Sequence, residues 1–287
     1  MNDTTEPVVS VLTPSYNQRP FLADCLRSVR EQTYPRVEHI VMDGGSMDGT
    51  VDLLQQAGDS VIWESRQDKG QSEALNRALE RSTGEIVGWV NSDDAYYRPD
   101  VIKKVVGVFA KHPETDVVYG HAALVNDNGL ILHLIWVPPF SARLLRLQTF
   151  IIQPAAFVRR SAIERSFIDE TYQYAMDREL WLRLSATHGF RRVPWILAID
   201  RHHLGRKGMT MQGVAESEGR RLRQEYGIRM DRGGVFKPYK VLVRYLGLGL
   251  IWSAVKPPFA FAAQSDGFAH VALRQIAIPR SRMPVTR

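Results

Sequence analysis

The first 90 residues alternate short apolar runs with amphipathic segments, and this alternation constrains the fold more than any other feature of the sequence. The run over 8–14 (VVSVLTP) is apolar and rich in β-branched residues, which is typical of a strand buried on both faces of a parallel sheet. The alternation predicts helices over 21–29, 48–56 and 72–80, and further strands over 37–42, 60–64 and 85–90. Four strands separated by three helices predict an α/β fold with a doubly wound, mostly parallel sheet.

The pattern changes after about residue 115. A small antiparallel element is predicted over 130–135, next to the turn at 126–129 (NDNG). A helix over about 176–188 and a strand near 195–199 follow. No Pro-, Gly- or Ser-rich linker separates the two halves, so we expect a single domain over 1–228.

The last 59 residues, 229–287, differ from the rest in charge. They hold ten Lys or Arg residues against Asp231 and Asp266, a net charge of +8, whereas the first 228 residues sum to −2. This asymmetry argues against a nucleic-acid-binding domain and predicts a separate basic, apolar, helical tail. Two interpretations stay open: an amphipathic helix on an anionic membrane surface, or a helix packed on the domain or on a second subunit.

The sequence shows neither the cysteines needed for disulfides nor the features of a targeting signal. Cys25 is the single cysteine, which excludes a disulfide framework and a cysteine-rich zinc site. The N-terminus lacks the basic and apolar regions of a signal peptide, and no run of about 20 uncharged apolar residues occurs. We therefore expect a cytoplasmic protein, with peripheral contact to the inner face of the cytoplasmic membrane left open.

Polar segments follow each of the four predicted strands. Their sequences are TPSYNQ (13–18), DGGSMDGT (43–50), SRQDKGQS (65–72) and NSDDAYY (91–97). Ligands of doubly wound sheets bind beyond the carboxyl ends of the strands, so we expect these loops to converge on one site. Neither GxGxxG nor GxxxxGK[ST] is present, which argues against dinucleotide and P-loop triphosphate binding.

Two of these loops allow a purely structural interpretation. Adjacent carboxylates such as Asp93 and Asp94 repel each other and often indicate a bound cation, but either one could instead cap a helix beginning near Arg98. The segment over 43–50 gives a ligand close access to the backbone, yet it could also be a turn with a helix cap from Ser46 or Asp48.

Taken in order, the motifs TPSYN, MDGGSMDGT, DKGQSEALNRAL and WVNSDDAYY resemble the nucleotide-sugar half of the family 2 glycosyltransferases. The match continues with QPAAFVRR (153–160), MDRELWLRL (176–184) and RHHLGRKGMT (201–210). The resemblance implies a GT-A fold, with a nucleotide-sugar half over 1–114 and an acceptor half over 115–228.

The resemblance also implies a donor site. The residues it implies around the base and ribose are Pro14, Ser15, Tyr16, Asp43, Asp68 and Lys69. Asp43 and Asp68 would accept hydrogen bonds from the base edge, which suits the imide of uracil. Asp93 would contact the ribose, and Asp94 would ligate Mg²⁺ or Mn²⁺ on the diphosphate. The motif here is Ser92-Asp93-Asp94 rather than a spaced Asp-x-Asp pair.

The chemical step requires a base, because a sugar hydroxyl has a pKa far above 7 and must lose its proton as it attacks. The resemblance implies that Asp177 is this base. Met176 replaces the glutamate that often precedes it in the family, and Glu179 is a weaker candidate. In the segment over 201–208, the resemblance implies a mobile loop whose His203 and Lys207 assist departure of the nucleotide.

Together these features predict an inverting, metal-dependent glycosyltransferase. Its donor would be a nucleoside-diphosphate sugar, UDP-linked, and its acceptor a hydroxyl of a glycan or lipid-linked molecule in cell-envelope polysaccharide assembly. The alternatives are a sugar nucleotidyltransferase and a non-catalytic nucleotide-sugar-binding protein. A nucleotidyltransferase would need a basic Gly-rich loop after the first strand, which TPSYNQRP does not supply.

Overall fold

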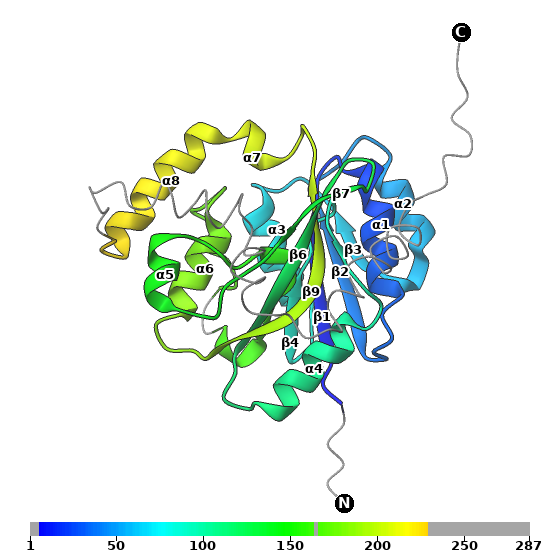
Figure 1. The fold of residues 1–287 in the computed structure, drawn as a ribbon. Helices are drawn as coiled ribbons and strands as arrows, with labels where there is room; N and C mark the ends of the chain where they lie inside the picture. The colour runs from blue at the N-terminus through cyan, green and yellow to red at the C-terminus, as the bar shows by residue number, and fades with distance from the viewer. Residues whose placement is uncertain (1–5, 164–165, 229–287) are drawn as a thin grey trace, which may run out of the picture.

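A computed structural model describes residues 6–163 and 166–228 as a central sheet with helices on both faces (Figure 1). The α/β fold predicted from the alternation is confirmed. The predicted tail over 229–287 lies outside the described residues. Among the helices that the structure describes, none has the length and apolar character needed to cross a membrane.

The sheet has nine strands in the order β3-β2-β1-β4-β8-β6-β9-β5, with β7 pairing with β6. Strands β1 to β4 pair in parallel, β8 runs antiparallel to β4 and β6, and β9 is parallel to β6. The bounds are β1 Val9–Ser15, β2 Val37–Asp43, β3 Ile62–Ser65, β4 Ile86–Trp89, β5 Ala95–Tyr96, β6 Val117–Asn126, β7 Ile131–Ile135, β8 Ala156–Arg159 and β9 Phe190–His202.

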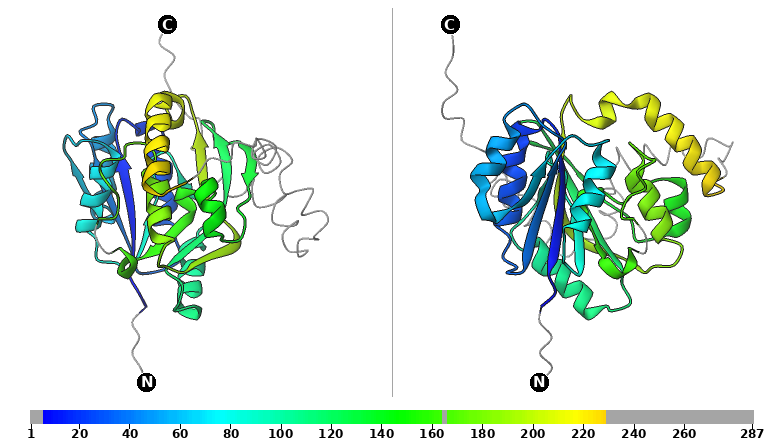
Figure 2. Two further views of the ribbon diagram at one scale, coloured as in Figure 1. Left: turned by 90° about the vertical axis from the view of Figure 1, so that its left-hand side faces the viewer. Right: turned by 180° about the vertical axis from the view of Figure 1, so that it is seen from behind.

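Alternate residues of the parallel strands face two different cores. In β1, Leu12 packs with α3, α5 and α6 on one face, while Val9 and Val11 pack with α1 and α4 on the other. Figure 2 shows these helix layers on opposite sides of the sheet. The helix bounds are α1 Arg19–Arg30, α2 Thr50–Ala57, α3 Gln71–Glu80, α4 Val101–Lys111, α5 Ala142–Leu147, α6 Met176–Leu184, α7 Lys207–Thr210 and α8 Gln212–Glu225.

Several predicted boundaries shift in the structure. A 3-10 turn over Gly58–Ser60 follows α2, so β3 begins at Ile62 rather than at residue 60. The helix predicted over 176–188 ends at Leu184, just before a tight approach in which a Cβ on Gly189 would lie 2.3 Å from the Glu114 carbonyl oxygen. The antiparallel element predicted over 130–135 is confirmed as β7.

The strand directions place the functional loops. Because β8 runs antiparallel to both β4 and β6, strands β1, β2, β3, β4, β6 and β9 all point the same way. Their carboxyl ends lie along the upper edge of the sheet in Figure 1, where the chain passes from β9 into α7. The polar loops after these strands therefore share one edge, as predicted.

Candidate active site

The loops after β1 and β2 are joined by direct hydrogen bonds. The backbone N–H of Asn17 donates to Ser46 Oγ at 2.7 Å, and that of Met47 donates to Asn17 Oδ1 at 3.0 Å. The N–H of Arg19, the first residue of α1, donates to Asp48 Oδ2 at 2.9 Å. Ser46 and Asp48 thus stabilise a shared platform. Gly49 occupies the N-cap position of α2, but Asp48 Oδ1 accepts the backbone N–H of Thr50, the first residue of the helix, at 3.0 Å. Asp48 therefore also stabilises the start of α2, as its capping interpretation predicted, whereas Ser46 does not.

Asp43, the last residue of β2, stabilises this platform through hydrogen bonds. Its side chain is fully buried and accepts hydrogen bonds from the N–H groups of Gly45 and Ser46 and from the hydroxyls of Ser46 and Ser65. Four donors nearly saturate a carboxylate. Its contact with a nucleotide base stays a prediction, whereas its bonds within the loop are the role that the structure describes.

Tyr16 and Asp68 flank Gly44 at the mouth of the site. A Cβ on Gly44 would lie 3.2 Å from the Asp68 carboxylate and 3.2 Å from the Tyr16 ring, so only glycine fits without displacing them. The Tyr16 side chain is 61% exposed, which leaves one face of its ring free for stacking. Burial raises the pKa of Asp68 above its ordinary value, although the Gly70 N–H bonded to it acts in the opposite direction.

The other predicted base-site residues lie beside this pair. Pro14 and Ser15 are buried at the end of β1, and Ser15 Oγ has no hydrogen-bond partner among the described residues. Lys69 is exposed, and its backbone N–H donates to Glu73 Oε2 at 2.9 Å. The sequence therefore predicted the position of these residues correctly, at one edge of the sheet.

Asp94 is buried within a polar network. Its Oδ1 accepts the backbone N–H of Arg201 at 3.0 Å, and its Oδ2 accepts Asn91 Nδ2 at 3.0 Å. Burial raises its pKa well above the ordinary value, and the charges of Asp93 and Asp200 raise it further. The alternative that Asp93 or Asp94 caps a helix is wrong, because Asp100 is the N-cap of α4.

Asp93 faces the loop that follows β9. Its Oδ2 lies 2.9 Å from His203 Nε2, and the His203 ring packs against Phe21 with centroids 4.6 Å apart. The side chains of Asp93 and His203 are 16% and 9% exposed, so both reach the surface of the site.

The donor set suits a divalent cation that also binds phosphate. Among residues 6–163 and 166–228, no group of three or more His, Cys, Asp or Glu side chains is arranged to hold an ion. Mg²⁺ characteristically takes only one or two carboxylates and completes its shell with phosphate oxygens and water. Asp93 Oδ2 and His203 Nε2 contact each other directly at 2.9 Å, so a metal ion bound here would replace this hydrogen bond. Asp93 and Asp94 are the carboxylates that could share such an ion with a diphosphate.

Arg201 is a positioning residue that sequence reasoning missed. It is 3% exposed, and its guanidinium bonds to the Asp93 carbonyl at 3.0 Å, the Asp127 carbonyl at 3.3 Å and the Asp24 carboxylate at 3.1 Å. It also packs over the Phe21 ring. Arg201 thus joins the end of β9 to the loop that carries Asp93. Its position at the start of the motif RHHLGRKGMT is the signal that could have indicated it.

Arg206 was also missed. Its guanidinium pairs with Asp200 at 2.8 Å. Its positive charge lowers the pKa values of Asp94, Asp200 and Asp177, although burial raises each of them more. One cation therefore acts on both the Asp94 cluster and the first turn of α6.

Lys207 lies between the same two regions. Its Nζ donates to the Gln173 carbonyl at 3.1 Å. Burial lowers its pKa to about 8, while the charges of Glu218, Asp68 and Asp93 act to raise it. The segment over 201–208 therefore places Lys207 within the electrostatic range of the loops that carry Asp68 and Asp93.

Asp177 is the second residue of α6 and is partly buried. Burial raises its pKa, and the Arg178 backbone N–H, which donates to Asp177 Oδ1 at 2.7 Å, acts against this rise. A raised pKa suits a carboxylate that accepts a proton. The residue in the N-cap position of α6 is Ala175, so Asp177 is not a helix cap.

Glu179, the weaker candidate for the base, has a structural role. Its side chain is 6% exposed and forms a salt bridge with Arg183 at 2.9 Å. Its Oε1 also accepts the Tyr226 hydroxyl at 2.9 Å. These bonds direct the carboxylate toward the end of α8, which argues against it as the base.

Glu218 fixes the chain just before Asp177. This buried side chain accepts the backbone N–H groups of Gln173, Tyr174 and Ala175 at 2.7, 2.9 and 2.8 Å. Sequence reasoning missed it, because a glutamate on a polar helix carries no local signal of a tertiary contact.

A known family model, "Glycosyl transferase family 2", matches residues 10–170. This span is more than half of the chain and contains all four polar loops. The chain belongs to glycosyl transferase family 2. The family resemblance of its motifs is thereby confirmed.

Relatives of known sequence agree with this assignment. A PGL/p-HBAD biosynthesis glycosyltransferase of Mycobacterium tuberculosis is 29% identical over 158 residues, which are 54% of this chain and 60% of that protein. TuaG of Bacillus subtilis, whose name assigns it to teichuronic acid biosynthesis, is 38% identical over 105 residues, 35% of this chain and 41% of that protein. The matches thus span less than two thirds of these relatives.

Solved structures share the fold. S. aureus TarS 1–349 in complex with UDP-GlcNAc superposes with a TM-score of 0.63 at 17% identity, covering 95% of this chain and 82% of that one. The mannosyltransferase PcManGT of Pyrobaculum calidifontis, in complex with GDP-Man and Mn²⁺, gives a TM-score of 0.57 at 20% identity, covering 94% and 81%. The predicted GT-A fold is confirmed by these neighbours.

Proposed function

We propose that this glycosyltransferase moves a sugar from a UDP-linked donor to a hydroxyl of a glycan or lipid-linked acceptor, in one inverting and metal-dependent step. The observation that carries the proposal is the position of the segment after β9. Arg206 pairs with Asp200 at 2.8 Å next to Arg201, whose backbone N–H bonds to Asp94. Lys207 Nζ donates to the Gln173 carbonyl, four residues before Asp177. The proposed leaving-group site and base site would then share the cations of one segment.

The donor base is proposed to bind between Tyr16 and Asp68. An exposed aromatic ring gives the base a stacking surface, and a carboxylate accepts the N–H of an imide such as that of uracil. Both side chains lie close to Gly44, which brings the Tyr16 ring and the Asp68 carboxylate near each other. Asp43 supports this contact through the loop, and Lys69 lies at its rim. Complexes of TarS with UDP and UDP-GlcNAc support this nucleotide, whereas PcManGT binds GDP-Man.

The metal is proposed to bind at the Asp93-Asp94 pair, with His203 as a further ligand. The sequence favoured Asp94 as the ligand and Asp93 as the ribose contact. We propose Asp93 as the ligand instead, because both Asp94 oxygens already accept hydrogen bonds while Asp93 reaches the surface beside His203. When bound, Mg²⁺ or Mn²⁺ would neutralise charge on the departing diphosphate. The Mn²⁺ in the PcManGT complex supports this class of ion.

The base is proposed to be Asp177. Its carboxylate accepts the proton of the acceptor hydroxyl as the oxygen attacks the anomeric carbon and the bond to the diphosphate breaks. A single displacement of this kind inverts the anomeric configuration. Glu218 holds the preceding backbone and so sets the direction of the Asp177 side chain.

Departure of the diphosphate is proposed to be assisted by Arg206 and Lys207. Both are cations of the chain that follows β9, and their charges already stabilise the surrounding carboxylates. Cations placed where negative charge develops lower the barrier without reorganisation. Closure of this segment over the donor would also exclude water.

The acceptor class rests on the names of relatives. The names of these relatives, PGL/p-HBAD biosynthesis and teichuronic acid biosynthesis, support the proposed role in cell-envelope glycan assembly. The whole activity is tested by incubating the protein with Mn²⁺ and a panel of nucleotide sugars and measuring nucleoside diphosphate release. Release from UDP-sugars alone supports the donor assignment, and equal release from GDP-sugars contradicts it.

A further inference from the structure

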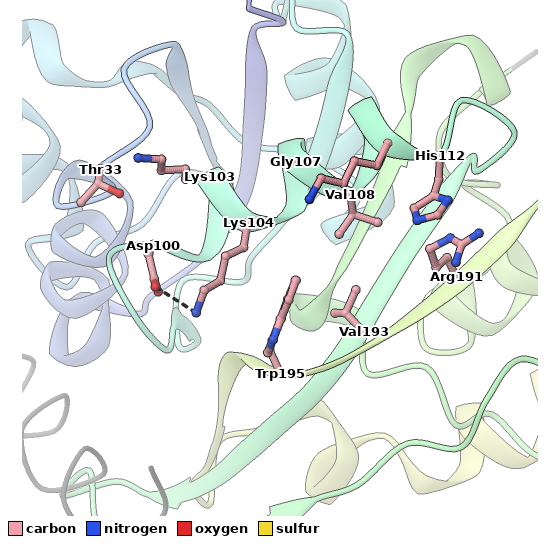
Figure 3. Close-up of a pocket in the computed structure, with 11 residues that line it drawn as sticks. Thr33, Asp100, Lys103, Lys104, Gly107, Val108, His112, Arg191, Val193 and Trp195 are labelled. Atoms are coloured by element: carbon pink, nitrogen blue, oxygen red, sulfur yellow. Dashed lines mark ion pairs between the residues drawn. The ribbon is translucent and has the colours of Figure 1, made fainter. Parts of the chain in front are cut away.

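A groove of about 730 Å³ lies between α4 and the first half of β9, away from the active site (Figure 3). Arg191 pairs with Val118 near the amino ends of β9 and β6, whereas the active-site loops follow the carboxyl ends. Figure 1 shows α4 at the lower end of the molecule, opposite α7 and α8. The groove is lined by residues that include Lys103, Lys104, Gly107, Lys111, Arg191 and Trp195.

The groove carries more positive charge than its own carboxylates neutralise. Lys104 pairs with Asp100 at 2.9 Å, and Arg191 pairs with Glu114 at 2.9 Å. Lys103 and Lys111 are exposed, and neither has an ion pair within the part of the chain that the structure describes. Two unpaired cations therefore line the groove.

Gly107 opens the space between these two lysines. Lys103, Gly107 and Lys111 are spaced four residues apart and share one face of α4. A Cβ on Gly107 would meet nothing within 4 Å, so the helix surface is bare at the centre of this face. Eight residues of α-helix span about 12 Å, which is wider than one phosphate group.

Trp195 adds a flat apolar surface. The centroid of its half-buried ring lies 5.5 Å from Lys104 Nζ, and Figure 3 shows Lys104 beside the ring, with its amine directed toward Asp100. Val108 and Val193 continue the apolar lining beside it. An aromatic ring beside cations suits a ligand that combines a pyranose ring with negative charges.

We propose that this groove binds a segment of an anionic polysaccharide, with at least two charged groups about 12 Å apart and a sugar ring over Trp195. Two charged groups on one polymer would engage Lys103 and Lys111 separately, and lysine footprinting distinguishes this from binding of a single phosphate. A flat membrane surface would not enter a groove whose aromatic side chain is half-buried. The groove is remote from the active site, so it would hold the polymer without taking part in transfer.

Lysine footprinting of the full-length protein tests this site directly, using oligogalacturonate as the probe and neutral maltohexaose as the comparison. Acetylation of Lys103, Lys104 and Lys111, measured by mass spectrometry, is expected to fall at least about threefold with oligogalacturonate and to stay unchanged with maltohexaose. Lys69, exposed at the other edge of the sheet, is the internal control. Protection by phosphatidylglycerol vesicles or by inorganic phosphate, but not by oligogalacturonate, would overturn the proposal.

Matched variants distinguish the contribution of the shape of the groove from that of its positive charge. Gly107→Leu fills the groove without changing the charge, and Lys103→Gln with Lys111→Gln removes two charges. Each change is expected to weaken oligogalacturonate protection of Lys104 by about tenfold in probe concentration. Arg143→Gln with Arg220→Gln removes two exposed charges elsewhere and should have no effect. Because none of these residues lies in the active site, diphosphate release with a small acceptor should not change. Equal protection in all variants would contradict the proposal.

Discussion

His203 Nε2 lies 2.9 Å from Asp93 Oδ2, and this contact joins the end of the last long strand to the loop after β4. The two groups come from positions 110 residues apart in the chain. Both side chains are partly exposed, Asp93 by 16% and His203 by 9%. Under the proposed function, a bound metal ion would replace their hydrogen bond and be held by both groups.

We therefore expect Asp93→Asn and His203→Ala each to reduce the Mn²⁺-dependent part of UDP affinity by about tenfold or more. Isothermal titration of UDP with Mn²⁺ and with EDTA measures this difference. Asp94→Asn is the matched comparison. If Asp94→Asn alone abolishes the difference, the ligand is Asp94, as the sequence indicated.

Asp177→Asn is expected to lower kcat by about 10²-fold or more while donor affinity is retained, because only proton removal is lost. Glu179→Gln is the matched control, since it removes a carboxylate two residues away that bonds to Arg183 and Tyr226. The control should keep kcat but lower stability by about 1–3 kcal/mol. Steady-state kinetics and thermal unfolding distinguish the two. Near-normal turnover of Asp177→Asn would place the base elsewhere.

The sequence predicted where the candidate site loops lie better than the contacts that hold them in place. All four strand-end loops were expected at one edge, because apolar runs and polar loops alternate within short windows. The contacts of Arg201 with Asp24 and of Glu218 with the backbone at 173–175 join residues far apart in the chain. No local pattern encodes such pairs, so only the tertiary structure reveals them.

The strand β9 illustrates the same limit. Its predicted part, 195–199, is apolar, but the structure extends it to Phe190–His202 through Arg191, Arg192 and Pro194. These residues lower the strand propensity of the segment in isolation. The long parallel pairing with β6 stabilises the strand despite this low propensity. The same pairing brings the charged segment after residue 200 to the active-site edge.

The activity should depend on pH through Asp177 and Lys207. Burial raises the pKa of Asp177, so kcat should fall as pH decreases through that raised value and the base becomes protonated. Burial lowers the pKa of Lys207 to about 8, so kcat should also fall as pH rises above about 8 and the cation is lost. Lys207→Arg keeps its charge and should remove the alkaline decrease. An unchanged alkaline limb in this variant would exclude Lys207 as its cause.

Glu218→Gln should lower kcat by about tenfold while UDP affinity stays the same, because the backbone before Asp177 loses its charged acceptor. A merely structural role would lower the melting temperature and leave kcat unchanged. Glu225→Gln on the same helix is a suitable control, since its carboxylate bonds to the side chains of Arg221 and Tyr172 and, among the contacts described, to none of these backbone N–H groups. Kinetics, UDP titration and thermal unfolding of both variants give the comparison.

The basic segment over 229–287 is expected to attach the enzyme to anionic membranes. Its net charge of +8 is interleaved with apolar residues such as Leu246, Ile251 and Trp252. Each Lys or Arg near an anionic surface contributes about 1 kcal/mol, and salt weakens this attraction. Cosedimentation with vesicles should therefore retain the full-length protein on anionic lipid at low salt, but neither on zwitterionic lipid nor at high salt. A chain ending at Ile228 should stay in the supernatant throughout. Equal recovery of both proteins in the supernatant under every condition would contradict membrane attachment and favour a helix packed on the domain or on a second subunit.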